Sequence, residues 1–193
     1  LIPDVEHPRI ITCHIGSGAS IAAIKDGKCV ATSMGLTPLG GIMMGTRTGD
    51  IDPSVVYFLC KKLNKSIDEV YEILNKKSGL LGVSGVSNDS RDVLKAMENG
   101  NPRALLADAL FNRRIADYIG QYFVRLGGAD LIIFSAGIGE NSAYFRSRVI
   151  EEIGPALGVK IDETINESSR GVSVLLSTPD SKVKVALIPT DEE

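Results

Sequence analysis

The sequence predicts an α/β fold in which a mixed sheet is flanked by helices. The chain opens on strand-like runs, continues through helical segments, and returns to a strand, a helix and closing strands. A sheet begun by hairpin strands and completed after helices contains both antiparallel and parallel pairs. With 193 residues, 44% of them hydrophobic and 23% charged, the chain is long enough for one sizeable core. We expect a single domain over residues 1–193.

Three strands are expected first, at Arg9–Ile15, Ser20–Lys25 and Lys28–Ser33. Asp26-Gly27 separates the last two and is typical of a two-residue hairpin, because that turn needs positive φ. Gly16-Ser17-Gly18 follows the first strand and predicts a tight turn whose size suits a bound phosphate. The chain therefore begins as an antiparallel sheet with a glycine turn at one edge.

Residues 35–50 contain five glycines, which is too many for a helix and too long for a simple connection. Long loops in compact domains tend to be functional. Helices are then expected over 55–62, after Asp52-Pro53, and from the capping box Ser66–Glu69 to about Lys77.

Asn101-Pro102 starts the longest helix, and Gly127-Gly128 ends it. Its apolar residues recur at helical spacing, at Leu105, Ala109, Ile115, Ile119, Tyr122 and Leu126.

A second glycine segment, Ser135–Ser142, follows the predicted strand Asp130–Phe134 and precedes a helix that starts near Ala143. Backbone N–H groups at such a junction suit an anionic ligand, and Asn141 is expected to be the N-cap. Two glycine turns after two strands indicate a nucleotide held between two loops. Strands at 171–176 and 182–188 complete the prediction.

Composition argues against several classes of protein. The net charge of −3, with no basic stripe, argues against a nucleic-acid surface. No apolar stretch approaches the roughly 18–20 residues of a membrane span. Cys13, Cys29 and Cys60 have neither metal-ligand spacing nor a disulfide pattern, so we expect free core cysteines of a cytoplasmic protein.

Arg47 and His14 are the first candidates for chemistry. Arg47 stands between glycines in the long loop, where its planar fork suits a phosphate; a surface arginine in a mobile loop is the alternative. His14 ends the first strand beside the glycine turn. It either donates to a phosphoryl oxygen or is a half-buried histidine bonded to backbone.

Asp89-Ser90-Arg91 follows a predicted loop at 78–85. Either Asp89 caps a helix, or these residues reach a ribose or base. The acids Glu192 and Glu193 belong either to a helix starting at Thr190 or Asp191, or to a Mg²⁺ site in which waters bridge the carboxylate and the ion. Because the chain stops where this helix would begin, we expect a fragment.

Five motifs together strongly resemble the acetate kinases, in the right order and over nearly the whole chain. They are His14–Ser20, Ser33–Asp50, Ser78–Ser84, Ala136–Asn141 and Ile188–Glu193. The resemblance falls on the C-terminal half of such an enzyme. It implies the ribonuclease-H-like fold of the acetate and sugar kinase, Hsp70 and actin superfamily.

The implied reaction is reversible phosphoryl transfer between ATP and acetate, giving acetyl phosphate and ADP with Mg²⁺. Residues 1–193 would then be the single C-terminal ATP-binding domain of a two-domain cytoplasmic kinase, without its N-terminal domain and with a truncated last helix. The resemblance also implies a homodimer joined through this domain, and an isolated chain that is inactive.

Family roles carry over to matching positions. Arg47 would stabilise the transferring phosphoryl group with His14 beside it, and Glu192 would be the carboxylate linked to magnesium. Nucleotide contacts would come from three segments: His14, Ile15, Gly16, Ser17 and Gly18; Asp89, Ser90 and Arg91; and Gly137, Ile138, Gly139, Glu140 and Asn141.

Ser17 stands where the family typically has asparagine, and Ser90 where an aromatic residue is common, so nucleotide affinity is the property most affected. A propionate or butyrate kinase of the same family is the alternative with the same chemistry. A non-catalytic nucleotide-binding module on this fold is the alternative of another class. Arg47 favours an enzyme, because a binding module needs no transition-state arginine.

Overall fold

The computed structural model describes residues 2–191. Its contacts divide the chain into two compact units. The first, called the sheet unit below, comprises Leu1–Ser33 and Asn112–Glu193; the second, the helical unit, is Met34–Phe111. The helical unit is thus a continuous insertion in the sequence of the sheet unit.

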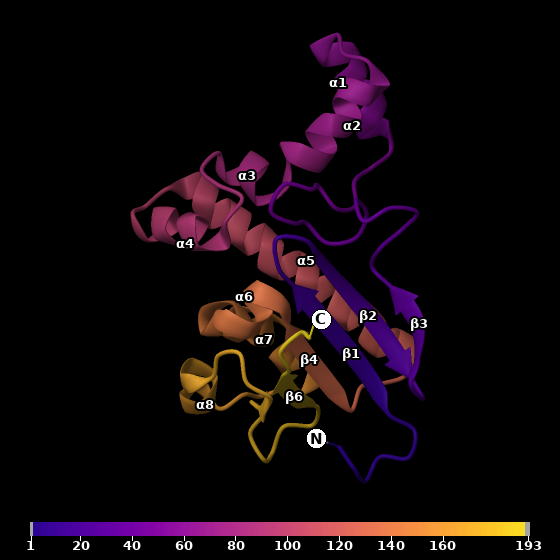
Figure 1. The fold of residues 1–193 in the computed structure, drawn as a ribbon, viewed down its shortest axis with the longest axis vertical. Helices are drawn as coiled ribbons and strands as arrows, with labels where there is room; N and C mark the ends of the chain where they lie inside the picture. The colour runs from indigo at the N-terminus through magenta and orange to yellow at the C-terminus, as the bar shows by residue number, and fades with distance from the viewer. Residues whose placement is uncertain (1, 192–193) are drawn as a thin grey trace. The chain divides into compact units, whose positions relative to one another are not determined.

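The sheet unit is built on one six-stranded mixed sheet, so the predicted α/β class is confirmed (Figure 1). Its strand order is β3-β2-β1-β4-β6-β5. The strands are β1 (Arg9–Ile15), β2 (Ala19–Lys25), β3 (Lys28–Thr32), β4 (Leu131–Ser135), β5 (Val174–Leu175) and β6 (Lys184–Leu187). β4 pairs in parallel with both β1 and β6, and the other neighbours are antiparallel.

The predicted hairpin between β2 and β3 is confirmed. Asp26 and Gly27 have φ of 51° and 74°, the positive values that a tight two-residue turn requires. β1 alternates buried and half-buried side chains, as a strand with one core-facing side should. The Arg9 guanidinium and backbone N–H both bind the Asp130 carboxylate, which ties the start of β1 to the start of β4.

Helices α6 (Ala136–Asn141), α7 (Ala143–Leu157) and α8 (Glu163–Ser168) follow β4. Phe145 of α7 meets Phe134 of β4 edge to face, with ring centroids 5.9 Å apart. This contact anchors α7 on the sheet. The long helix α5 (Pro102–Leu126) begins and ends where the sequence predicts, and its residues from Asn112 onward belong to the sheet unit.

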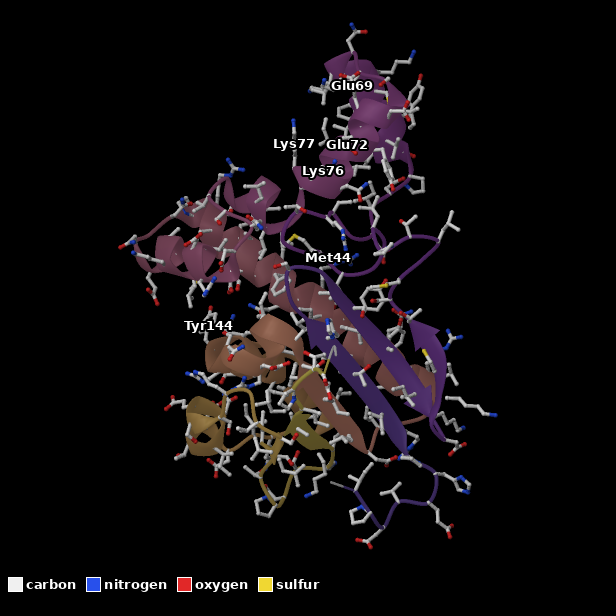
Figure 2. All side chains as sticks on the ribbon, viewed as in Figure 1. Met44, Glu69, Glu72, Lys76, Lys77 and Tyr144 are labelled. Carbon is white, nitrogen blue, oxygen red and sulfur yellow. The ribbon has the colours of Figure 1, made fainter. Side chains whose placement is uncertain are left out.

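The helical unit contains α1 (Ser54–Leu63), α2 (Ile67–Lys76), α3 (Gly79–Ser84) and α4 (Ser90–Glu98). The capping box is confirmed: Glu69 N–H donates to Ser66 Oγ and Ser66 N–H donates back to the Glu69 carboxylate. Figure 2 shows Glu69, Glu72 and Lys76 along α2, where Glu72 and Lys76 form an ion pair.

Several expectations about the elements differ from the structure. Residues 79–84, expected in a loop, form α3, since Gly79 supplies a left-handed start with φ of 61°. Leu105 and Ala109 are exposed, because the small side chains of Ala104 and Ala107 occupy the buried side of α5 instead.

The closing strands β5 and β6 are shorter than predicted. Cys29 is exposed and Cys60 is half-buried, so only Cys13 lies in the core as expected, although all three cysteines are free.

Candidate functional site

Three parallel strands of the sheet unit end at the same edge. His14 at the end of β1 is opposite Ser135 at the end of β4, and Phe134 is opposite Leu187 at the end of β6. In open α/β sheets, ligands bind outside the carboxyl ends of the strands. This edge is therefore the candidate site of the sheet unit.

The two predicted glycine segments meet at this edge. Gly16 N–H donates to Gly18 O at 3.0 Å, which closes the turn after β1. A Cβ placed on Gly16 would lie 3.7 Å from Ala136 Cβ and 3.9 Å from Gly137 N. Segments separated by more than a hundred residues in the sequence are thus in contact.

The junction after β4 differs from its prediction. Helix α6 starts immediately, at Ala136, whose φ of 62° is a strained value for a residue with a side chain. Ser142, not Asn141, is the N-cap of α7: its hydroxyl accepts from Phe145 N–H at 3.2 Å. Asn141 instead lies in α6 and donates its side-chain amide to Gly137 O.

Glu140 joins α6 to the segment after β6. One carboxylate oxygen accepts from Ala136 N–H at 2.8 Å, Thr190 N–H at 2.9 Å and Thr190 Oγ1 at 2.8 Å. Burial raises the pKa of Glu140, but the bonds from Thr190 and Ala136 and the nearby His14 outweigh it, so the net pKa lies below the ordinary value. The carboxylate is an internal anchor that holds Thr190 at the site edge.

The predicted nucleotide residues of the sheet unit differ in exposure. Ser17, Gly137 and Asn141 are exposed, whereas Ile15 and Gly139 are buried. A Cβ on Gly139 would lie 3.5 Å from the backbone of Phe134, an ordinary van der Waals distance, so a small side chain would fit at this buried position. A Cβ on Gly137 would meet nothing within 4 Å, and this residue has no positive φ. Neither packing nor conformation requires glycine at 137.

Arg47, in the helical unit, stands in a loop held by its backbone. Met44 N–H donates to Arg47 O at 3.1 Å, and Thr48 N–H donates to Leu74 O at 3.0 Å. The Arg47 guanidinium lies 3.6 Å from Met44 Sδ and, within residues 2–191, forms no ion pair. A loop held by backbone bonds thus carries an arginine that has no carboxylate partner among the described residues.

Asp89 caps α4, as the first alternative predicts. Its carboxylate accepts from Arg91 N–H at 2.8 Å and from the Arg91 guanidinium at 2.5 Å. The bond from the Arg91 side chain is the main reason that the pKa of Asp89 is lowered. Ser90 begins the helix and is half-buried, and the Arg91 side chain is exposed. A nucleoside contact of Asp89–Arg91 stays a prediction.

Glu192, the predicted magnesium-linked carboxylate, lies outside the described residues. Over residues 2–191, no group of three His, Cys, Asp or Glu side chains is placed to hold a metal ion.

The helical unit also contains a pocket of about 480 Å³ walled mainly by apolar side chains, among them Leu36, Ile51, Tyr71 and Leu74. The glycine-rich loop 35–50 lines it together with α1 and α2.

Residues 3–193 match the acetokinase family. The chain belongs to this family. It is 55% identical over 190 residues to the acetate kinase of Clostridium novyi, and this match covers 98% of this chain and 47% of that relative. It is 54% identical over 185 residues to the acetate kinase of Bacteroides thetaiotaomicron, covering 96% of this chain and 46% of the relative. The resemblance stated from the motifs is confirmed.

Solved structures of the family share the fold. The crystal structure of Porphyromonas gingivalis acetate kinase has a TM-score of 0.92 and 47% identity, covering 97% of this chain and 47% of that one. A propionate kinase from Francisella tularensis has a TM-score of 0.89 and 39% identity, covering 96% and 47%. The chain spans about half the length of these relatives. Within the described residues, no helix is long and apolar enough to cross a membrane.

Sequence reasoning missed Arg146. This arginine of α7 is fully buried and contacts α6 directly. Its sequence context, within an amphipathic helix rich in charged residues, gave no signal that it points inward.

Proposed function

We propose that the whole protein transfers a phosphoryl group reversibly between ATP and acetate, and that this chain supplies its nucleotide-binding half. In the forward direction an acetate oxygen attacks the γ-phosphorus, and the bond from that phosphorus to the bridging oxygen of ADP breaks. The products are acetyl phosphate and ADP. Family membership supports the reaction, and the meeting of the two glycine segments at the strand ends supports the nucleotide site.

The exposed glycine at position 137 is the main support for placing the nucleotide at this edge of the sheet. It is exposed at the edge where β1 and β4 end, and neither packing nor backbone conformation requires a glycine there. A glycine of this kind allows close approach of a ligand to the backbone. We assign the nucleoside side of the site to Gly137–Asn141 and the phosphate side to His14–Gly18, with His14 donating to a phosphoryl oxygen.

Arg47 is assigned to the transferring phosphoryl group, and Asp89–Arg91 to the nucleoside. Phosphoryl transfer depends on positioning and charge neutralisation more than on covalent help. The backbone bonds of its loop would position Arg47, and its guanidinium, which has no carboxylate partner within residues 2–191, would neutralise charge on the phosphoryl group.

Mg²⁺ is assigned to the nucleotide phosphates, with Glu192 as the associated carboxylate. Mg²⁺ in such sites keeps several waters and binds phosphates with one or two carboxylates. The ion would neutralise charge on the phosphates, while the chain itself orients them.

Calorimetric titration of Mg-ADP into this chain tests the assignment. We expect saturable binding by the wild type and by Arg47→Ala, with dissociation constants within about threefold, because Arg47 acts on the transition state. Gly137→Val is expected to abolish binding without loss of fold.

The control for Gly137→Val is Gly120→Val, since Gly120 is also a helical glycine whose added Cβ meets nothing within 4 Å. Equal binding by the wild type and Gly137→Val refutes the site. No binding by the wild type at millimolar Mg-ADP refutes nucleotide binding by this half alone.

A propionate kinase is the second candidate, favoured by the Francisella tularensis structure at a TM-score of 0.89. Turnover of the whole protein on propionate and on acetate distinguishes the two. Faster turnover on propionate than on acetate would identify propionate, not acetate, as the preferred substrate.

A cytoplasmic homodimer is the assembly that the family resemblance implies. Exposed apolar side chains on the first half of α5, at Leu105, Leu106 and Leu110, offer it a surface. Sedimentation equilibrium of the whole protein tests this, and a monomer at micromolar concentration contradicts it.

A further inference from the structure

Arg146 is a charged side chain at the centre of the sheet unit, with no exposed surface. It projects from α7 between α6 and the segment that contains α8. A guanidinium has five N–H donors in a fixed planar fork, and a buried donor without a partner is costly.

All five donors of Arg146 have partners. Nε donates to Asn166 Oδ1 at 2.7 Å, and Nη1 donates to Gly139 O at 2.9 Å and to Glu140 O at 3.0 Å. Nη2 donates to Asn166 O at 2.8 Å and to Ser169 O at 3.1 Å. Four of the five acceptors are backbone carbonyls, so the side chain holds main chain rather than another charged group.

The charge of Arg146 is compensated by dipoles. Burial, and secondarily Arg170, lower its pKa to about 10, while Glu163 raises it, so the guanidinium stays charged at neutral pH. Within residues 2–191 no carboxylate lies within ion-pair distance of it. The carbonyls it binds lie in the last turn of α6, in the last turn of α8 and at Ser169, the C-cap of α8, where helix dipoles favour a positive charge.

We propose that Arg146 is a positioning residue for the candidate nucleotide site. By fixing the carbonyls of Gly139 and Glu140, it sets the path of α6, and with it the exposed backbone of Gly137 and the Glu140 carboxylate that anchors Thr190. Because Arg146 also donates to Asn166, the position of α6 depends on α8 as well. The identity of the ligand rests on the proposed function; the positioning of α6 does not.

Lysine at 146 keeps the charge but loses the fork. Its single ammonium has three donors on one atom, so it cannot reach the carbonyls of α6 and of the α8 segment together. Arg148 provides the matched control. It stands on the same helix and pairs with Glu151, but it lies outside this cluster.

Hydrogen exchange of the ligand-free chain is the first measurement. In Arg146→Lys we expect amide exchange over residues 137–141 to rise at least about tenfold, with the β1–β4 ladder unchanged, and in Arg148→Lys no change. A uniform rise across the sheet unit indicates general destabilisation and overturns the proposal. Amide exchange of Arg146→Lys at wild-type rates over residues 137–141 also overturns the proposal.

Titration of Mg-ADP is the second measurement. Arg146→Lys is expected to raise the dissociation constant about tenfold or more, because small displacements of positioning groups are costly. An unchanged constant overturns the proposal. If the wild type shows no binding while exchange responds as expected, the nucleotide assignment fails and the positioning of α6 stands.

A second variant covers the case in which Arg146→Lys does not fold. Asn166→Ala removes one acceptor of the fork and leaves four. It should give the same local pattern of exchange at smaller amplitude. Exchange confined to α8, with residues 137–141 as in the wild type, overturns the proposal.

Discussion

Replacing Glu140 with alanine is expected to release both the start of α6 and the segment after β6. The substitution deletes three hydrogen bonds to one carboxylate oxygen, two from Thr190 and one from Ala136. A bond to a charged group contributes about 1.5–3 kcal/mol in a buried setting. Because this carboxylate is only half-buried, solvent screening reduces that value, and we expect a total loss of about 2 kcal/mol.

The assay combines urea unfolding followed by circular dichroism with amide exchange at Ala136 and Thr190. Thr190→Val is the matched comparison: it keeps the backbone bond to Glu140, loses only the hydroxyl bond, and should cost about 1 kcal/mol. If Glu140→Ala unfolds at the wild-type urea concentration and both amides exchange at wild-type rates, the anchor contributes nothing and the reasoning fails.

The cost of Glu140→Ala should depend on pH with a defined sign. The pKa of Glu140 is lowered in the folded state, so its contribution is complete above the unfolded value of about 4.3 and is lost as pH falls through the folded value. The difference between wild type and variant should therefore be full at neutral pH and shrink in acid. A difference that grows in acid contradicts the assigned direction.

Two further substitutions test backbone geometry. Gly79→Ala should destabilise the helical unit by about 3 kcal/mol or more in urea unfolding, because a Cβ there would lie 2.1 Å from Met44 O at a φ of 61°. Gly27→Ala is the control: its φ is similar but the space around it is open, so it should cost about 1 kcal/mol. Equal costs for the two variants would refute the steric clash at Gly79. Ser142→Ala should cost about 1 kcal/mol and Asn141→Ala much less, as measured by thermal unfolding; the reverse order would restore Asn141 as the cap.

Local chemistry made much of the fold predictable. Asp26-Gly27, the Ser66–Glu69 capping box and Pro102 each act on backbone groups within a few residues, so their signals are complete in a short stretch of sequence. The two glycine segments were predictable for the same reason. The contact between the two segments follows from the parallel pairing of β1 and β4. The residues of the two segments do not predict that pairing; only the resemblance to the family implies it.

The features that were missed depend on partners distant in the sequence. Glu140 binds a residue 50 positions away, and Arg146 binds carbonyls up to 23 positions away. Leu105 illustrates a different difficulty: its helical spacing is correct, but two neighbouring stripes of α5 are apolar, and periodicity does not say which one is buried.

The parallel pairing of β1 with β4 has a consequence for the order of folding. Arg9 and Asp130 are 121 positions apart, and the whole helical unit lies between the strands that they join. Contacts within the helical unit span shorter distances along the chain and can form first, whereas closing the β1–β4 loop costs chain entropy before any ladder bond forms. We therefore expect the edge that carries both glycine segments to form late in folding. A ligand that binds this edge only in the folded state would therefore shift the folding equilibrium toward chains whose sheet is complete.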